Sequence, residues 1–322
     1  MPRSLFAAAS LFLILRIVSP GHAEANLKRP PGTTRYAAMV QQLTALRDYD
    51  KAHAGRMALT SIGKSVEGRD LWLISLHDSS TDSGKRLFYL CRQHGHEPAS
   101  TEGALAFVNT LIKAAKDTPL ADDLRRVTVY VLPMANADGS EAFVRHNAHN
   151  IDLNRDWLRR TQSETRALYA EIQRLHPDLM TDQHELYPND PRPNFTETAG
   201  PGSGALPELI QECDRTQASV QGAMQAEGFP SVCHLITDKH PARLAHRYGC
   251  IVAGIPTILF ETNRLTGSGR TVAARAAAQE QFMMTILRDQ SGERDKLLAE
   301  AAAWQMSHAL PPAKPMSEKG ND

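Results

Sequence analysis

The feature that most constrains the fold is a regular alternation of short apolar runs with longer stretches of helical character. Apolar and β-branched runs predict strands at 71–76, 87–91, 127–132 and 256–261, and a helix is predicted at 163–175. Strands separated by helices favour a parallel or mixed sheet with helices packed on both of its faces. The sequence therefore predicts an α/β fold of three layers, α/β/α, around a mixed, mostly parallel central sheet.

Further elements complete this expectation. A helix is predicted at 33–51, a second helix opens after Pro98, and a short strand is predicted at 178–181. Residues 187–204 are dense in Pro and Gly, so we expect them to lack regular structure and to form a long loop of the kind that often borders a functional site. Ala-rich helices are expected after the last strand, up to about residue 310.

The first 25 residues have the pattern of a secretory signal peptide. An apolar run, LFAAASLFLIL, follows Arg3, and the small residues Ala23 and Ala25 precede the expected cleavage point. The run is shorter than the about 20 residues that a membrane span needs, and Arg16 interrupts its extension, which argues against an uncleaved membrane anchor. We expect a secreted or periplasmic protein with no stable membrane insertion after cleavage.

The charge balance argues against one large class of partners. The chain has 36 Lys and Arg against 36 Asp and Glu, so no excess of basic charge is present to neutralise phosphates, and nucleic acid is not expected as a partner. The 4 cysteines are too few for a disulfide scaffold, although an oxidising compartment would permit one or two bridges. We favour Cys213 with Cys233 as a pair and regard Cys91 and Cys250 as buried apolar residues, but the pairing stays open.

The first polar cluster lies where a predicted core strand ends. The strand at 87–91 runs directly towards His94 and Glu97, and His184 stands at the end of a later strand. The carboxyl ends of strands in an α/β sheet are where ligands gather. Two imidazoles and one carboxylate form the ligand set of a catalytic zinc ion with one position left for water. The sequence therefore predicts one zinc ion per chain, bound by His94, Glu97 and His184.

A second polar cluster follows the strand at 127–132. It places Arg145, Asp152, Asn154 and Arg155 within a short stretch. Asx-rich segments in loops are often only turns, but a guanidinium fork beside an amide is suited to binding a carboxylate. We therefore expect this stretch to bind an acidic group.

Glu261 ends the last predicted strand, where a core strand meets a cleft. A charge in such a place usually needs a partner or a purpose, and a purely structural pairing with Arg264 is one reading. Beside a zinc ion, the same carboxylate would instead take a proton from an attacking water.

Taken together, these residues resemble the zinc carboxypeptidases of the carboxypeptidase A type, in the form of a compact bacterial member. The elements that carry the resemblance occur in the family's order and are His94-x-x-Glu97, Asn136-x-Asp138-Gly139, Arg145, Asp152-x-Asn154-Arg155, His184 and Phe260-Glu261. Residues 62–69 also resemble the family's first strand and turn. The resemblance implies the zinc carboxypeptidase, or phosphorylase/hydrolase-like, fold. It also implies a catalytic domain at 26–310. The composition of 311–322, PPAKPMSEKGND, separately predicts a disordered tail.

The resemblance implies roles around the metal. His94, Glu97 and His184 would hold zinc, and Asp152 would orient a ligand histidine from behind. The substrate would be a peptide, or a peptide-like molecule, with a free carboxylate.

The resemblance also implies the catalytic roles. Glu261 would be the general base that activates a water and then protonates the leaving amine. Arg145 would stabilise the oxyanion of the scissile carbonyl. Asn154 and Arg155 would bind the terminal carboxylate, which makes the expected enzyme a metallocarboxypeptidase.

Some positions depart from the family pattern. His96 stands where many members carry Arg, so an extended peptide is expected to be held less firmly; a ligand role for His96 is the other reading. Tyr248 is the candidate for the family's substrate-binding tyrosine, although a packed core or hinge role fits it as well. Residues 241–255 contain no Asp or Glu, which predicts a weak preference for Lys or Arg at the substrate's end.

Three other functions remain open at this point. One is a cell-wall (murein) peptide amidase, whose substrate also presents a free carboxylate. Another is an N-acyl amino acid deacylase of the desuccinylase or aspartoacylase type, against which Arg145 and the signal peptide count. The last is a non-catalytic pseudopeptidase that binds peptides.

Overall fold

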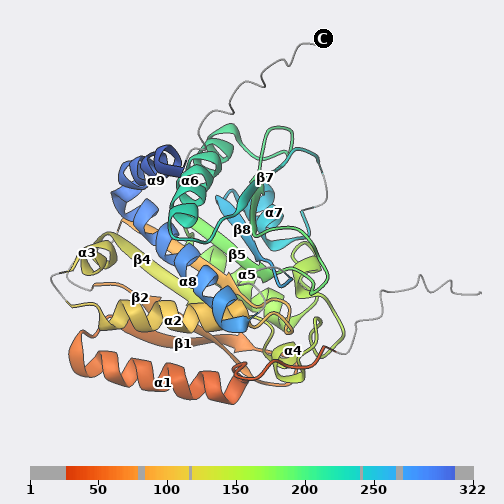
Figure 1. Ribbon diagram of the computed structural model, residues 1–322. Helices are drawn as coiled ribbons and strands as arrows, with labels where there is room; N and C mark the ends of the chain where they lie inside the picture. Colours follow the sequence, from red (N-terminus) through yellow and green to blue (C-terminus); the bar gives the residue numbers. More distant parts are fainter. Residues whose placement is uncertain (1–26, 79–83, 116–117, 240–241, 266–270, 309–322) are drawn as a thin grey trace, which may run out of the picture.

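The protein is described by a computed structural model (Figure 1). The described residues are 27–78, 84–115, 118–239, 242–265 and 271–308. The predicted signal peptide and the predicted C-terminal tail lie outside these ranges. Within them, none of the helices combines the length and the apolar character that crossing a bilayer requires.

The centre of the molecule is an eight-stranded mixed sheet with the order β1-β2-β4-β3-β5-β8-β6-β7. Its strands are β1 (Met57–Lys64), β2 (Asp70–Leu76), β3 (Lys85–Cys91), β4 (Val127–Leu132), β5 (Leu179–Glu185), β6 (Phe195–Ala199), β7 (Val232–Ile236) and β8 (Thr257–Thr262). The inner strands β4, β3, β5 and β8 run parallel, whereas β2 and β6 are antiparallel to their inner neighbours. The predicted mixed, mostly parallel sheet is confirmed.

Helices cover both faces of this sheet (Figure 1). They are α1 (Tyr36–His53), α2 (Ala99–Lys113), α3 (Pro119–Arg126), α4 (Ala137–Ala142), α5 (Ser163–Leu175), α6 (Pro207–Ala226), α7 (Ala245–Tyr248), α8 (Val272–Arg288) and α9 (Arg294–His308), with single turns η1 (Leu153–Arg155), η2 (Gly249–Ala253) and η4 (Asp289–Glu293).

Successive side chains of the central strands pack alternately into two separate apolar cores, one on each face of the sheet. Tyr89 on β3 packs in the core with α1, α2 and α8, whereas its neighbours Phe88 and Leu90 pack in the core with α5 and α7. This is the two-residue period of a strand that is buried on both sides. The middle of the sheet is therefore buried on both faces, and the candidate site residues lie at its carboxyl edge.

One predicted loop is only partly a loop. Residues 195–199, which fall within the expected irregular segment 187–204, form β6 and pair with both β8 and β7. The local sequence FTETA alternates, and the buried hydroxyls of Thr196 and Thr198 are satisfied by Gln217 at 2.7 Å and by the carbonyl oxygen of Thr257 at 2.8 Å. Pro and Gly on both sides of this short strand concealed it.

Candidate active site

Two adjacent strands bring the predicted metal ligands together. β3 and β5 are parallel neighbours, so His184 near the end of β5 lies beside the loop that follows β3. That loop turns at Arg92, whose φ of 57° lies in the left-handed region, and then carries His94 and Glu97 to the start of α2.

The three side chains form one compact group. His94, Glu97 and His184 are buried, and their candidate ligand atoms all lie within 4.8 Å of one another. Nδ1 of His94 lies 2.8 Å from Oε1 of Glu97, and Nδ1 of His184 lies 2.8 Å from Oε2 of the same carboxylate. The two Nδ1 atoms are 3.1 Å apart. The structure thus aims two imidazole nitrogens and one carboxylate at a single small volume.

The hydrogen bonds behind the imidazoles show that this group fits a zinc ion. Nε2 of His94 lies 3.2 Å from Asp152, and Nε2 of His184 lies 2.8 Å from Asp182. An imidazole that donates its Nε2 proton to a carboxylate turns a lone pair outward at Nδ1. Two such lone pairs that face each other beside a carboxylate are stabilised by a bound cation, and two His with one Glu are ligands that zinc accepts.

The ligand loop is held by close backbone packing. A Cβ at Gly95 would approach the backbone carbon of Gly139 to 2.0 Å, so only glycine fits there. Asn136 ties the same segments together, because its Nδ2 donates to the carbonyl oxygens of Gln93 and Arg145 at 3.2 and 3.1 Å. Its Oδ1 accepts the N–H of Gly139 at 2.9 Å. The loop that begins at Asn136 therefore positions the metal ligands.

Asp152 connects the ligand set to Arg145. Its Oδ1 faces His94, and its Oδ2 accepts from Nε and Nη2 of Arg145 at 3.0 and 2.9 Å. Nη1 of the same guanidinium lies 3.7 Å from Glu97. Burial alone would raise the pKa of Asp152, but His94 and Arg145 hold it well below its usual range. This carboxylate therefore stays ionised and fixes both neighbours.

Glu261 lies on the opposite side, near the end of β8, with its backbone opposite His184 in the sheet register. Its Oε2 is shielded from solvent and has no hydrogen-bond partner among the described residues. Burial raises the pKa of Glu261 to about 7. The alternative that Glu261 forms a structural ion pair with Arg264 is wrong. Arg264 instead donates to the carbonyl oxygen of His96 at 3.1 Å and pairs with Glu185 at 3.3 Å.

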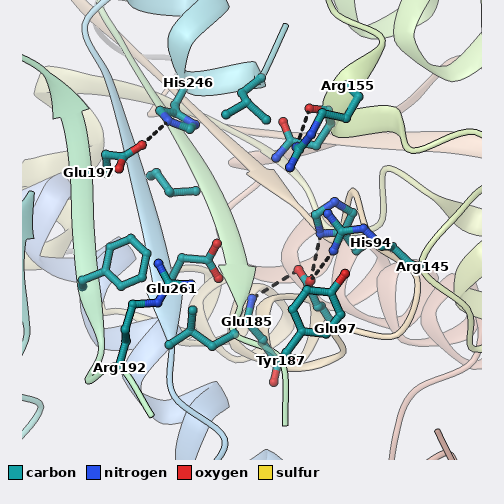
Figure 2. A pocket seen from close by; sticks show the side chains of 15 residues that line it. His94, Glu97, Arg145, Arg155, Glu185, Tyr187, Arg192, Glu197, His246 and Glu261 are labelled. Carbon is teal, nitrogen blue, oxygen red and sulfur yellow. Dashed lines mark hydrogen bonds and ion pairs between the residues drawn. The ribbon is translucent and has the colours of Figure 1, made fainter. Parts of the chain in front are cut away.

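His94, Glu97, Arg145 and Glu261 line one cleft of about 230 Å³ (Figure 2). The lining residues are His94, Glu97, Arg145, Asn154, Arg155, Glu185, Leu186, Tyr187, Arg192, Phe195, Glu197, Leu244, His246, Leu259 and Glu261. In Figure 2, His94, Glu97 and Arg145 lie on one side of the cleft, and Glu261 lies across from them, on the side of Glu197 and His246.

Residues 43–197 match the family model for zinc carboxypeptidases. This stretch of the chain has the sequence of a zinc carboxypeptidase domain. The resemblance read from the sequence is confirmed by this match. Glu261 lies beyond the matched residues, so its place opposite the ligand set rests on the structure of the chain itself.

Curated relatives of the family share part of their length with this chain. Carboxypeptidase SOL1 of Arabidopsis thaliana is 35% identical over 116 residues, which cover 35% of this chain and 24% of that protein. Carboxypeptidase 2 of Trichophyton tonsurans is 30% identical over 172 residues, which cover 52% of this chain and 30% of that protein. The chain therefore spans about a quarter to a third of the length of these relatives.

Solved structures of similar fold cover more of the chain. A metallo-carboxypeptidase from Burkholderia cenocepacia aligns with a TM-score of 0.63 at 23% identity, covering 78% of this chain and 68% of that one. A metallo-carboxypeptidase from Pseudomonas aeruginosa, in complex with (2-guanidinoethylmercapto)succinic acid, aligns with a TM-score of 0.62 at 21% identity, covering 81% and 68%. At these identities the likeness shows the shared fold.

The two residues predicted to bind a terminal carboxylate lie side by side in the cleft. Asn154 is buried, and its Oδ1 is already engaged because it accepts the N–H of Ala245 at 2.8 Å. Arg155 is exposed and donates from Nη1 to the carbonyl oxygen of Asn154 at 3.1 Å. Arg155 is therefore the freer of the two groups for an incoming anion.

The structure places Tyr248 away from this cleft. Its ring is buried against Trp157 and Tyr169, with centroid distances of 5.7 and 6.3 Å, and its hydroxyl lies 3.5 Å from Arg160. Tyr187 is the tyrosine that lines the cleft; its ring lies 5.4 Å from the guanidinium of Arg145 and is half exposed. Of the two roles open for Tyr248, the packed one matches this position.

His96 lies near the ligand set but outside the group of converging ligand atoms. Its ring is buried, with an edge-on contact of 6.3 Å to His94 and 6.0 Å to Tyr187. Burial lowers the pKa of His96 to about 3, so the ring is neutral. The contacts make His96 a packing neighbour of the ligand loop, in place of the arginine that many members carry.

Three residues around the cleft were missed by the sequence analysis. Nε2 of His246 lies 2.9 Å from Glu197 (Figure 2). Its Nδ1 lies 3.5 Å from Asp182, which also pairs with His184. Asp182 precedes His184 by two residues on β5, so the strand period alone would have placed both on one face. Glu197 and His246 come from the hidden strand β6 and from the four-residue helix α7, which carry no comparable signal.

Proposed function

We propose that the chain is a zinc-dependent metallocarboxypeptidase that hydrolyses the C-terminal amide bond of peptides. The observation that carries the proposal is the arrangement across the cleft. A buried ligand set of two histidines and one glutamate faces Glu261, whose Oε2 no cation or donor among the described residues holds. The match of residues 43–197 to zinc carboxypeptidases supports the same activity.

The group proposed to bind the substrate's terminal carboxylate is Arg155, at the open side of the cleft. Arg155 is exposed and lines the cleft, and its side chain is positioned to pair with the terminal carboxylate of a peptide. The carbonyl oxygen of Asn154 accepts a hydrogen bond of 3.1 Å from Nη1 of Arg155 and so helps to hold this guanidinium in place. A free carboxylate is then the feature that distinguishes substrates from internal peptide bonds.

The reaction divides between the two sides of the cleft. A zinc ion held by His94, Glu97 and His184 would supply a Lewis acid that polarises the scissile carbonyl and lowers the pKa of a water. Glu261 accepts a proton from the attacking water and gives it to the nitrogen of the leaving amino acid. A pKa near 7 suits a group that must accept and then release a proton at neutral pH.

Arg145 stabilises the charge that develops on the carbonyl oxygen. Its guanidinium is held in place by Asp152 and by the ring of Tyr187, so it needs no reorganisation when that charge appears. Asp152 thereby orients a metal ligand and the oxyanion donor at the same time. Its ionised state keeps both contacts intact.

The test uses matched peptides that differ only at the C-terminus. The full chain, produced with its leader removed during export, is incubated with peptides that end in a free acid or an amide. Each reaction is run with and without a zinc chelator and read by mass spectrometry. We expect loss of single residues from free-acid peptides alone, abolished by the chelator and restored by added zinc.

Two results would contradict the proposal. Equal cleavage of free-acid and amidated peptides would show that Arg155 does not select substrates by binding a terminal carboxylate. A zinc-loaded protein that cleaves neither peptide but releases acid from N-acyl amino acids, or cuts cell-wall peptides, would replace carboxypeptidase activity with deacylase or amidase activity.

A further inference from the structure

Two cysteines from segments far apart in the sequence meet next to the cleft wall. Cys213 lies on α6, Cys250 lies on η2, and both segments pack against β6. Both side chains are buried, at 0% and 2% exposure, and they share a small apolar cluster with Ala199 and Leu209. Both are free thiols in the structure, and each has the largest effect on the pKa of the other, so the two thiols lie close together. This pairing differs from the pair Cys213 and Cys233 that the sequence analysis favours.

The other two cysteines have different surroundings. Sγ of Cys233 on β7 lies 3.6 Å from Oγ1 of Thr196 and 3.9 Å from the carbonyl oxygen of Gln217, one helical turn beyond Cys213. Sγ of Cys91 accepts from Nε2 of Gln183 at 3.5 Å inside the sheet. Among the described residues, neither Cys91 nor Cys233 has another thiol as a partner, so Cys213 and Cys250 are the candidate pair.

The two paired thiols differ in acidity. The neighbouring thiol of Cys213 lowers the pKa of Cys250 to about 6, whereas the thiol of Cys250 and burial raise the pKa of Cys213. Sγ of Cys250 also lies near two further groups, 3.8 Å from Oγ1 of Thr198 and 3.4 Å from the carbonyl oxygen of Thr257. In the folded chain the two sulfurs are therefore neighbours, as the partners of a disulfide bond must be.

We propose that Cys213 and Cys250 form a disulfide bond in the mature protein. The oxidant is a disulfide of low-molecular-weight or oxidoreductase type, and the reaction is balanced as two exchanges. Cys250 thiolate attacks one sulfur of the donor disulfide and releases the other as a thiolate. Cys213 then loses its proton, attacks the sulfur of Cys250 and releases the remaining donor sulfur. The protein loses two electrons and two protons, and the donor becomes a pair of thiols.

The position of this bond gives it a structural effect on the cleft. η2 follows α7 directly, and α7 carries His246, which is bonded to Glu197 at the end of the cleft. The bond would tie that wall to α6 independently of any zinc ion. Because both sulfurs are buried in the folded chain, the exchange takes place before α6 has packed against η2. The proposal does not depend on the proposed enzymatic activity.

Trypsin separates the four cysteines, which makes the bond directly readable. Each cysteine falls in its own tryptic peptide, 87–92, 175–215, 216–239 or 248–264, because the Arg192–Pro193 bond is not cut. The full chain is refolded from denaturant in buffered reduced and oxidised glutathione, and in parallel purified after export. Both samples are alkylated in denaturant without reductant, digested and analysed by mass spectrometry. We expect 175–215 linked to 248–264, with Cys91 and Cys233 alkylated, and loss of the linked species after reduction.

Two outcomes would overturn the assignment. Alkylation of all four cysteines without reductant in both samples would show that no bond forms. A link between 175–215 and 216–239 would replace it with the pair Cys213 and Cys233.

Thermal stability tests the structural effect. Reduction of the wild type should lower Tm by about 5 to 10 °C, as expected for a bond that closes a loop of this length. The double variant Cys213→Ala, Cys250→Ala should show no response to reductant, whereas the control Cys233→Ala should retain the full response. A response that survives in the double variant, or disappears in the control, would contradict the proposal. If the double variant fails to fold, the peptide map of the wild type decides alone.

Discussion

The two sides of the cleft handle charge in opposite ways. On the metal side, Glu97 and Asp152 are surrounded by His94, His184 and Arg145, and every carboxylate oxygen has a partner. On the other side, Glu261 has one oxygen without a hydrogen-bond partner among the described residues. Arg264, which could have neutralised this carboxylate, contacts the carbonyl oxygen of His96 and the carboxylate of Glu185 instead.

This difference separates the tasks of binding and proton transfer. Carboxylates that are paired on all sides stay ionised and hold their neighbours in fixed geometry. A buried carboxylate without such partners has a raised pKa and can change its protonation state near neutral pH. The sequence places Glu residues on both sides, but only their surroundings distinguish the proposed metal ligand Glu97 from the proposed base Glu261.

The largest expected effect comes from Glu261. Glu261→Gln keeps the size of the side chain but cannot accept a proton, so we expect kcat on a free-acid peptide to fall about 10³- to 10⁴-fold. Zinc content should not change, because the ligand set lies on the other side. Steady-state kinetics and metal analysis of the same preparation check this. Full activity of the zinc-loaded variant would show that another group is the base.

Arg145 is the next test of the comparison. Arg145→Ala removes the donor to the developing oxyanion, and we expect kcat/KM to fall about 10²- to 10³-fold. The matched control is Arg174→Ala, because Arg174 is exposed on α5 and bonded only to Glu171 in the described structure. The control should keep wild-type rates. An increase in KM with kcat unchanged would instead show that Arg145 contributes to substrate binding.

Much of this arrangement can be read from the sequence because it follows strand ends. The strands 127–132 and 256–261 were predicted within a residue of β4 and β8, and helix 163–175 was predicted as it stands. The polar residues that directly follow such strands then meet at one edge of the sheet, which is why His94, Glu97 and His184 could be grouped beforehand.

What could not be read depends on contacts between distant segments. β6 is short and is stabilised by strands on both sides, so its local sequence looked like a loop. The contact between Cys213 and Cys250 depends on how α6 packs against η2. Tyr187 and Tyr248 illustrate the same limit, since only tertiary packing decides which ring reaches the cleft and which is buried.

Asp152 tests whether the pairing on the metal side is needed for metal binding. Asp152→Asn keeps the shape but removes the charge behind His94, so we expect zinc affinity to fall about 10- to 100-fold. Competition with a chromogenic chelator measures this, and Asp214→Asn, an exposed change on α6, serves as the control. Unchanged zinc affinity would mean that Asp152 acts only through Arg145.

The smallest effect comes from a carboxylate that is paired far from the cleft. Burial alone would raise the pKa of Glu212 on α6, but Arg294 at 2.7 Å and Arg215 at 2.9 Å outweigh it and lower the pKa to about 2. A pKa lowered on folding stabilises the protein above the unfolded pKa of about 4.3, and this contribution is lost as the pH falls from there towards 2. Because Glu212 is partly exposed, solvent screening reduces the effect to about 1 kcal/mol.

The variant Glu212→Gln should therefore lower the free energy of unfolding by that amount at pH 7, measured by urea denaturation of the zinc-free protein. The difference from wild type should shrink steadily between pH 5 and pH 3. Glu208→Gln, an exposed change on the same helix, should show no such trend. A constant difference at all pH values would mean that Glu212 acts through packing between α6 and α9, not through its charge. In that case the ion pairs of Glu212 would not contribute to stability through charge, unlike the ion pairs proposed for Glu97 and Asp152 on the metal side.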